Sequence, residues 1–432
     1  MTVPRFKNWK WAVCGVLMLA TLLNYMDRQA LPQTATELKR LYHLDDARYG
    51  LLEGCFSWAF AAGSVFFGLL ADRFGPRRLY PIVLVGWSAG GLLTPFTGTE
   101  SLTNYLQVEG DAPGAGPYRW LLGCRTMLGL FESGHWPCAL LTARQILTAA
   151  ERPLGNGLLQ SGAALGAILI PLYVREVRNL GGDWGVVFWT VGAAGLLWVP
   201  LWLALVRSGD LAGQTPPAAG SEDGRPPPNV GRVIATLAII VCTLTISWQF
   251  LRAWLPKYLK ESVGFDADRA DFAVAGYYIA AEIGCLLAGV FVKLLVARGL
   301  RVHSARLACY ALYAGITALA ALVPFVDSSA AKMGLLMVAG AGILGLHPYY
   351  YSLAQELPTK WMASVSGLLA AGAWVVAGFV QTYLGKRIEE TKSYADGLML
   401  AGLVPLVGLL ALAFLWPKAV TSAPVEANSE SR

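Results

Sequence analysis

Charged residues are scarce in this chain, and their scarcity excludes most soluble classes of protein. Only 14% of the 432 residues are charged, whereas a soluble domain carries about 25%. Hydrophobic residues make up 55% of the chain, and the mean hydropathy is +0.50. The sequence therefore predicts a polytopic membrane protein. Its small net charge of +6 suits membrane flanks and not a nucleic-acid partner.

Constellations that would carry catalysis or hold a metal are also missing. The seven cysteines have neither metal-ligand nor disulfide spacing, and the four histidines are scattered. No G-x-x-x-x-G-K-[ST] motif is present, so ATP is not the expected energy source. We therefore expect no enzymatic activity, no cofactor and no metal.

Long apolar stretches, in contrast, are abundant. A spanning helix needs about 20 apolar residues, and twelve stretches qualify, at approximately 10–32, 48–71, 79–98, 119–148, 154–175, 185–206, 232–254, 270–296, 304–325, 332–354, 361–384 and 396–416. The first follows basic residues, as in a signal peptide. It is long and charged and lacks a small-x-small cleavage site, so we predict a retained first helix.

A segment rich in Pro, Gly and acidic residues separates the sixth stretch from the seventh and predicts a flexible linker. We expect an all-α membrane protein with two pseudo-symmetric six-helix bundles around a central cavity. The expected domains are bundles at 1–206 and 232–418, a cytoplasmic linker at 207–231 and a disordered cytoplasmic tail at 419–432. Basic loop residues modestly favour the side of the termini, which predicts an inner-membrane protein with both termini in the cytoplasm.

Two pairs of opposite charges lie inside these apolar stretches: Asp27 with Arg28, and Arg125 with Glu132. An ionised group at bilayer depth costs roughly 2.5–3.5 kcal/mol, so the four groups must face one another or a wet cavity. The set sums to zero when empty, yet its Arg forks can hold a carboxylate ligand. This predicts an anion-binding, proton-coupled transport site.

Each of the four charges has an expected role. Arg28 is the first choice for binding the substrate carboxylate, and Arg125 is a further expected substrate contact. Asp27 and Glu132 are the expected proton carriers, because desolvation and a moving Arg partner can tune a carboxyl group. Arg125 and Glu132 are seven residues apart and project from one face of a helix. The alternative for this pair is a structural ion pair between helices.

Other polar residues in the spans have two possible roles each. Gln160 can bind substrate hydroxyls or a neighbouring helix, while Gly162 and Gly166 predict close helix packing. Arg252 can contact substrate or merely snorkel to the membrane surface. Glu282 is a second candidate proton site or a partner of Arg252.

The tenth span contains a His-Pro pair followed by Tyr349, Tyr350 and Tyr351. Because Pro can break a helix and expose carbonyl groups at a cavity, we expect one of these tyrosines to line the pathway. Glu53 is expected to be a rim group. His135, one turn after Glu132, is expected to be a core residue, and the alternative is that it assists protonation.

The segment GLLADRFGPRR (68–78) resembles the loop signature of the major facilitator superfamily. The matching residues are Gly68, Asp72, Arg73, Gly75, Arg77 and Arg78. In that family the motif locks the cytoplasmic side in the outward-open state, so the resemblance implies a gating role. The alternative is a basic loop that only anchors the topology.

Further segments resemble the anion:cation symporter family, namely NYMDRQAL (24–31) and CRTMLGLFESGHWP (124–137). QELPTKWMASVSG (355–367) is similar to its hexuronate-transporter branch. The resemblance implies transport of organic anions with protons and makes Tyr25 a substrate contact. Relatives often carry Tyr where this chain has Phe60, and Asn near Val375, and both positions contact sugar hydroxyls.

The expected function is proton-coupled import of a small organic anion, a hexuronate or related sugar acid, by alternating access. The alternatives are transport of a non-sugar carboxylate, efflux, or ligand sensing without turnover. The expected partners are the anion, protons and the lipid bilayer, and the expected oligomeric state is a monomer.

Overall fold

The computed structural model describes residues 8–148, 151–207, 209–211, 229–357 and 359–417, and every regular element among them is a helix. The first half contains α1 (Trp9–Tyr42), α2 (Asp46–Phe74), α3 (Pro76–Leu93), η1 (Thr94–Gly98), α4 (Glu100–Thr103), η2 (Asn104–Leu106), α5 (Ala115–Glu132), α6 (His135–Ile146), α7 (Arg152–Asn179) and α8 (Trp184–Leu205). The second half contains α9 (Val230–Glu261), α10 (Ala267–Ala297), α11 (Val302–Ala318), η3 (Leu319–Phe325), α12 (Ser329–Ala354), α13 (Thr359–Thr391) and α14 (Ala395–Phe414). Most of the predicted linker and the whole predicted tail lie outside the described residues.

The helices match the twelve predicted spans, with one interruption. Eleven helical stretches in the described ranges are long and apolar enough to cross a membrane. The fourth predicted span is divided into α5 and α6, with the break at Ser133 and Gly134. The tenth span, α12, runs without interruption through Pro348, so the break suggested there is wrong. One proline removes only one backbone hydrogen bond, and neighbouring packing holds the helix through it.

Local sequence sets several helix ends. The side chains of Asp45, Asp183 and Asp266 accept hydrogen bonds from backbone N–H groups in the first turns of α2, α8 and α10. Such caps satisfy donors that the helix itself leaves free. Gly75 separates α2 from α3 with φ of +73°, a backbone conformation that favours glycine. Pro76 then begins α3.

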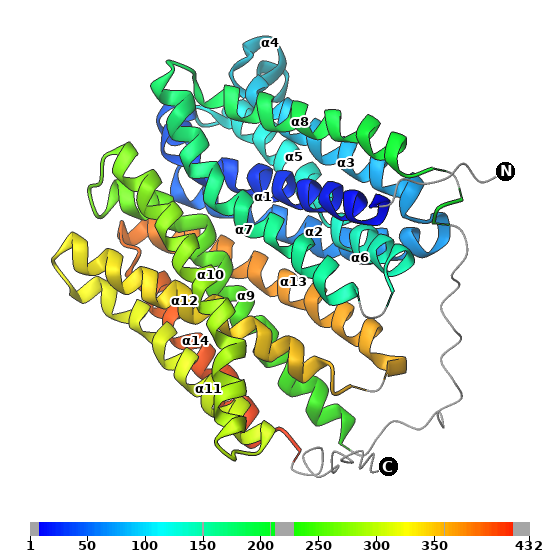
Figure 1. The fold of residues 1–432 in the computed structure, drawn as a ribbon. Coiled ribbons are helices and arrows are strands. Elements are labelled where there is room, and N and C mark those ends of the chain that lie inside the picture. Colours follow the sequence, from blue (N-terminus) through cyan, green and yellow to red (C-terminus); the bar gives the residue numbers. More distant parts are fainter. Residues whose placement is uncertain (1–7, 149–150, 208, 212–228, 358, 418–432) are drawn as a thin grey trace, which may run out of the picture.

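The two halves lie side by side, as the blue-to-green and green-to-red helices of Figure 1 show. They contact each other mainly through α2 against α13 and α7 against α10. Between α2 and α13, a Cβ atom on Gly50 would lie only 2.7 Å from the Cα atom of Gly385, so these backbones touch. Small residues therefore permit the close approach of the halves.

Two ends of the molecule can be distinguished. At the closed end, where α1 and α9 finish and α2 and α10 begin, ion pairs join the two halves. The open end holds the start of α1, the α2–α3 connection and the end of α12. A cavity of about 570 Å³ lies between the halves there, lined by Trp136, Leu140, Asn156, Leu159, Gln160, Tyr350, Tyr351, Ala354, Gln355, Ser366 and Ala370.

Candidate functional site

Six charged side chains from four helices gather in the interior. This central cluster consists of Asp27, Arg28, Glu53, Arg125, Glu132 and Arg252. Each of them is at most 4% exposed. The four charges singled out in the sequence are therefore buried together, and the structure adds one carboxylate and one guanidinium group to them.

The ion pairs differ from the sequence pairs. The Nε atom of Arg28 donates to Glu132 Oε2 at 2.7 Å, and its Nη2 atom donates to Asn24 Oδ1 at 3.1 Å. Arg125 does not pair with Glu132; its Nη2 atom donates to Glu53 Oε1 at 2.8 Å. Seven residues of helix separate Arg125 and Glu132 by about 10 Å along the axis, so groups from neighbouring helices reach each of them first.

Glu53 joins the two halves of the protein, and its expected place at a rim is wrong. It is fully buried on α2. One carboxylate oxygen accepts from Arg125 of the first half, and the other accepts from Arg252 of the second half. Arg252 is itself buried and also donates to Gln249. It therefore does not snorkel, because its charge is satisfied inside the protein.

Asp27 is the exception within the central cluster. Neither carboxylate oxygen has a hydrogen-bond partner among the described residues, although the side chain is buried. The carboxyl group lies against α3, where a Cβ atom on Gly91 would be 2.9 Å from Asp27 Oδ1. Glycine at this position leaves room for the acid. An unpartnered buried carboxylate is costly when ionised, which favours the neutral, protonated form.

Aromatic rings surround the guanidinium groups of the cluster. The Arg28 Cζ atom lies 5.0 Å from the ring centres of both Tyr25 and Phe60, and the Arg125 Cζ atom lies 4.3 Å from that of Phe56. Phe60 stacks on Trp374 of the second half, with ring centres 4.3 Å apart. The rings stabilise the cations. Val375 is partly exposed, and its carbonyl oxygen accepts from Trp58.

The break in the fourth span coincides with the cluster. α5 ends at Glu132 and α6 begins at His135, so the carboxylate sits at a helix terminus inside the protein. A Cβ atom on Gly134 would lie 2.6 Å from Val83, which leaves only a hydrogen at this position. Irregular backbone at membrane depth is tolerated where it is buried in protein or lines a cavity.

Other candidates separate into cavity residues and structural residues. Gln160, Tyr350 and Tyr351 line the cavity at the open end. Tyr349 does not; it is buried in the second half, where its hydroxyl donates to the carbonyl oxygen of Ala288. The cause is helical geometry, since neighbouring residues point about 100° apart. Glu282 is half-buried and has no ion pair or hydrogen bond in the described ranges, so it is not a partner of Arg252.

Two structural predictions for the first half are confirmed. His135 is fully buried, with its ring nitrogens beside the hydroxyl groups of Thr21 and Tyr80, as expected for a core residue. Gly162 and Gly166 pack against α1, where an added Cβ atom would lie 2.3 Å and 2.5 Å from backbone oxygens. These glycines therefore serve packing.

The predicted gating loop connects α2 and α3 at the open end. Asp72 and Arg73 are exposed, and Asp72 forms no ion pair within the described part of the chain. Arg77 donates to the carbonyl oxygen of Val206 at 2.9 Å, within the same half. Arg78 is exposed, and Gly68 has open space where a side chain would lie. The loop does not bridge the halves in this conformation, so its locking role stays a prediction.

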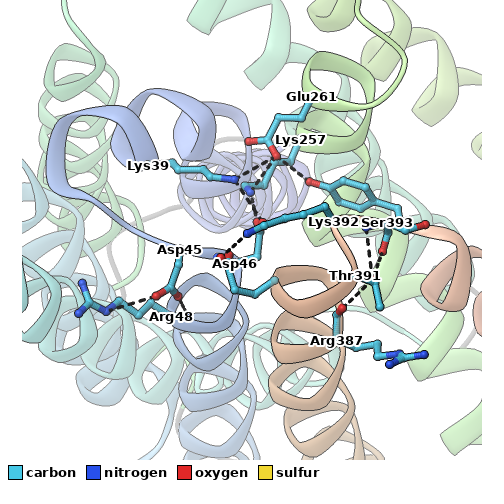
Figure 2. Close-up of polar contacts among 12 residues, drawn as sticks. Lys39, Asp45, Asp46, Arg48, Lys257, Glu261, Arg387, Thr391, Lys392 and Ser393 are labelled. Atoms are coloured by element: carbon cyan, nitrogen blue, oxygen red, sulfur yellow. Dashed lines mark hydrogen bonds and ion pairs between the residues drawn. The ribbon is translucent and has the colours of Figure 1, made fainter. Parts of the chain in front are cut away.

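A second group of polar residues joins the halves at the closed end. This closed-end network consists of Lys39, Asp46, Lys257, Glu261 and Tyr394, and Figure 2 shows Lys39 and Lys257 converging on the acidic side chains. Lys39 lies 3.2 Å from Asp46, and Lys257 pairs with both Asp46 and Glu261. Nearby, Arg178 of α7 binds Asp268 and Asp271 of α10. These contacts close one end of the space between the halves.

Comparison with known proteins agrees with this architecture. The Major Facilitator Superfamily profile matches residues 17–382. A protein of Cupriavidus necator described as a "Probable sulfoacetate transporter" is 25% identical, over 97% of each chain. A "Probable L-galactonate transporter" of Escherichia coli is 22% identical over 95% of this chain and 90% of its own. A D-xylose-proton symporter structure superposes with a TM-score of 0.70 at 15% identity, over 94% of this chain and 97% of that one.

Proposed function

Because this chain belongs to the major facilitator superfamily, we propose that it imports a small organic anion together with protons by alternating access. The observation that carries the proposal is the central cluster. Three guanidinium groups from both halves meet at one buried place, and Asp27 beside them lacks any partner in the described ranges. Arginine forks suit carboxylate and other oxyanion ligands.

Charge arithmetic supports the coupling of anion and proton. Three carboxylates and three guanidinium groups sum to zero when all are ionised. With Asp27 protonated the central cluster has a net charge of +1, which one bound monoanion neutralises. Loss of the proton then leaves the bound anion uncompensated, and an unpaired buried charge is expensive. Proton release and anion release therefore favour each other.

The conformation supports a direction of release. The halves are joined at the closed end and separated by the cavity at the open end. The open end carries Arg73, Arg77, Arg78 and Arg301, and basic loops favour the cytoplasm. We propose that the cavity faces the cytoplasm, with both termini on that side, in an inner membrane. Gln160 and Tyr350 would contact the anion as it passes from the central cluster through the cavity into the cytoplasm.

The names of the relatives support a sugar acid as substrate, since galactonate and galactarate/D-glucarate transporters are among them. One observation favours a second candidate, a compact acid without a hydroxyl chain. The stacked rings of Phe60 and Trp374 form an apolar wall beside Arg28, and the faces of these rings offer sugar hydroxyls no conventional hydrogen-bond partner. The sulfoacetate relative is consistent with this candidate.

Reconstituted transport decides between the two candidates. The purified protein is placed in liposomes, and uptake of labelled D-galactonate, D-glucarate, D-glucuronate and sulfoacetate is measured with and without an inward proton gradient. We expect concentrative uptake that an uncoupler abolishes. Saturable uptake of sulfoacetate with no uptake of the sugar acids would select the compact acid. Equal accumulation without any ion gradient would contradict proton coupling.

A further inference from the structure

Helices α2 and α9, which belong to different halves, are connected by three contacts in antiparallel order. Asp46 pairs with Lys257, the Tyr49 hydroxyl donates to the carbonyl oxygen of Ala253 at 2.7 Å, and Glu53 pairs with Arg252. Positions 46, 49 and 53 follow one face of a helix. The contacts run from the surface of the closed end into the central cluster. The innermost contact, between Glu53 and Arg252, therefore belongs both to this row of contacts and to the central cluster.

Glu53 occupies the guanidinium groups that a substrate would need. Its carboxylate lies between Arg125 of the first half and Arg252 of the second, with one oxygen toward each. Without it, two buried cations would face each other across the interface. Both arginines keep unused buried donors, at Nε and Nη1 of Arg125 and at Nη1 of Arg252. The Glu53 carboxylate thus joins the two halves at the innermost contact of the closed end.

We propose that Glu53 is an internal substitute for the substrate anion, and that its carboxylate closes the arginine pair Arg125–Arg252 when no substrate is bound. The inference rests on the proposed function and extends it to the empty carrier. A transporter that accumulates its substrate must change conformation without cargo. Glu53 supplies the negative charge that lets the closed end shut in that state. A bound substrate anion takes the place of the Glu53 carboxylate between Arg125 and Arg252. The closed end of the loaded carrier is then held shut by the contact between this anion and the two arginines.

The proposal predicts chemical rescue by a free carboxylate. Glu53→Ala removes the carboxylate and leaves space for acetate, which has the same reactive group as the lost side chain. Amide hydrogen exchange of full-length protein in detergent reports closure at residues 46–53 and 253–261. Without acetate we expect exchange there to be about 10- to 150-fold faster than in the wild type, the range for the one charge-assisted hydrogen bond lost between the halves, that of Glu53 with Arg252. Acetate should restore protection, whereas chloride at equal ionic strength should not.

Two further variants make the result specific. Glu53→Gln fills the space with a neutral side chain, so it should lose protection without recovering it in acetate. Tyr49→Phe removes the neutral contact on the same face of α2, so its smaller loss should be insensitive to acetate. Wild-type protection in both Glu53 variants without acetate would overturn the proposal. So would a folded Glu53→Ala protein that stays unprotected in acetate, because its arginines would then not accept a free carboxylate.

These measurements do not require a transported substrate. If acetate restores closure but no acid is taken up into liposomes, the proposed import is wrong and the role of Glu53 stands. If transport is found but the Glu53 variants close like the wild type, the proposed role of Glu53 is wrong and the proposed import stands.

Discussion

The central cluster and the closed-end network both join the two halves with ion pairs, but they differ in how well their groups are satisfied. In the closed-end network, Asp46 and Glu261 each have two cationic partners, and Glu261 also accepts from Tyr394 at 2.9 Å. In the central cluster, buried polar atoms of Asp27, Arg125, Glu132 and Arg252 have no partner among the described residues.

We infer that this difference separates closure from ligand binding. Buried polar atoms are normally hydrogen-bonded. A cluster of buried polar atoms without hydrogen-bond partners therefore indicates a site that binds and releases a ligand. A network whose polar groups are all paired has no free hydrogen-bonding group for a ligand. Its contacts hold the two halves together. Substitutions in the two regions should therefore have different consequences, and the following measurements test this.

The largest effect is expected for Asp27→Asn. The amide resembles the protonated carboxyl in shape and charge, and the acid has no ion-pair partner to lose among the described residues. The variant should fold and exchange substrate across the membrane, but it should not accumulate substrate against a gradient. Counterflow and proton-driven uptake on the same sample measure both activities. Glu282→Gln serves as the control and should accumulate substrate normally; if it alone fails, Glu282 is the proton carrier.

A charge-conserving exchange in each region gives the next largest difference. Arg28→Lys replaces a fork by a point charge in the central cluster and should weaken anion binding about 10- to 150-fold, as expected for one lost charge-assisted hydrogen bond. Lys39→Arg in the closed-end network keeps the charge at a partly exposed position, so affinity should stay unchanged. Binding isotherms on purified variants test the pair. Equal losses would remove the distinction between the regions.

A smaller effect is expected for Lys257→Met, which removes a buried ammonium group from the closed-end network. Asp46 keeps Lys39 as a partner, so the cost should be about 1–3 kcal/mol in the stability of the closed end. Hydrogen exchange at residues 253–261 should rise, while anion affinity should not change. A loss of affinity without any change in exchange would assign Lys257 to the binding site.

The smallest effect is expected at an ion pair outside both regions. Arg119 donates to Asp111 at 2.5 and 2.9 Å, which lowers the pKa of that partly exposed carboxyl below its usual value. The contribution of this pair is therefore present above the unfolded pKa and is lost only as the pH falls through the lower folded pKa. Asp111→Asn should leave transport unchanged at neutral pH, with faster exchange confined to residues 104–116. A transport defect would show that this loop takes part in gating.

Sequence reasoning located the buried charges but not their partners. Helical periodicity predicted that Arg125 and Glu132 share a face, and that is compatible with the structure. Helical periodicity could not show that Arg28 forms an ion pair with Glu132 and Arg125 one with Glu53, because these contacts join different helices. The rim position predicted for Glu53 is wrong, and no other charged residue within one turn of it on α2 marks the inner face of the helix. The only signal was its spacing of seven from Asp46, two turns along the same face.

The sequence by itself determined that this is a twelve-span membrane protein with ionisable groups inside its apolar spans, because hydrophobicity and length act locally along the chain. The family motif in residues 68–78 added the fold. Only the tertiary structure decided which charges pair, which carboxyl of the central cluster has no partner among the described residues and which end is closed. Those outcomes depend on the rotation and approach of helices, which contacts such as Gly50 with Gly385 set. Electrostatic energy changes steeply over such distances, so no one-dimensional pattern specifies it.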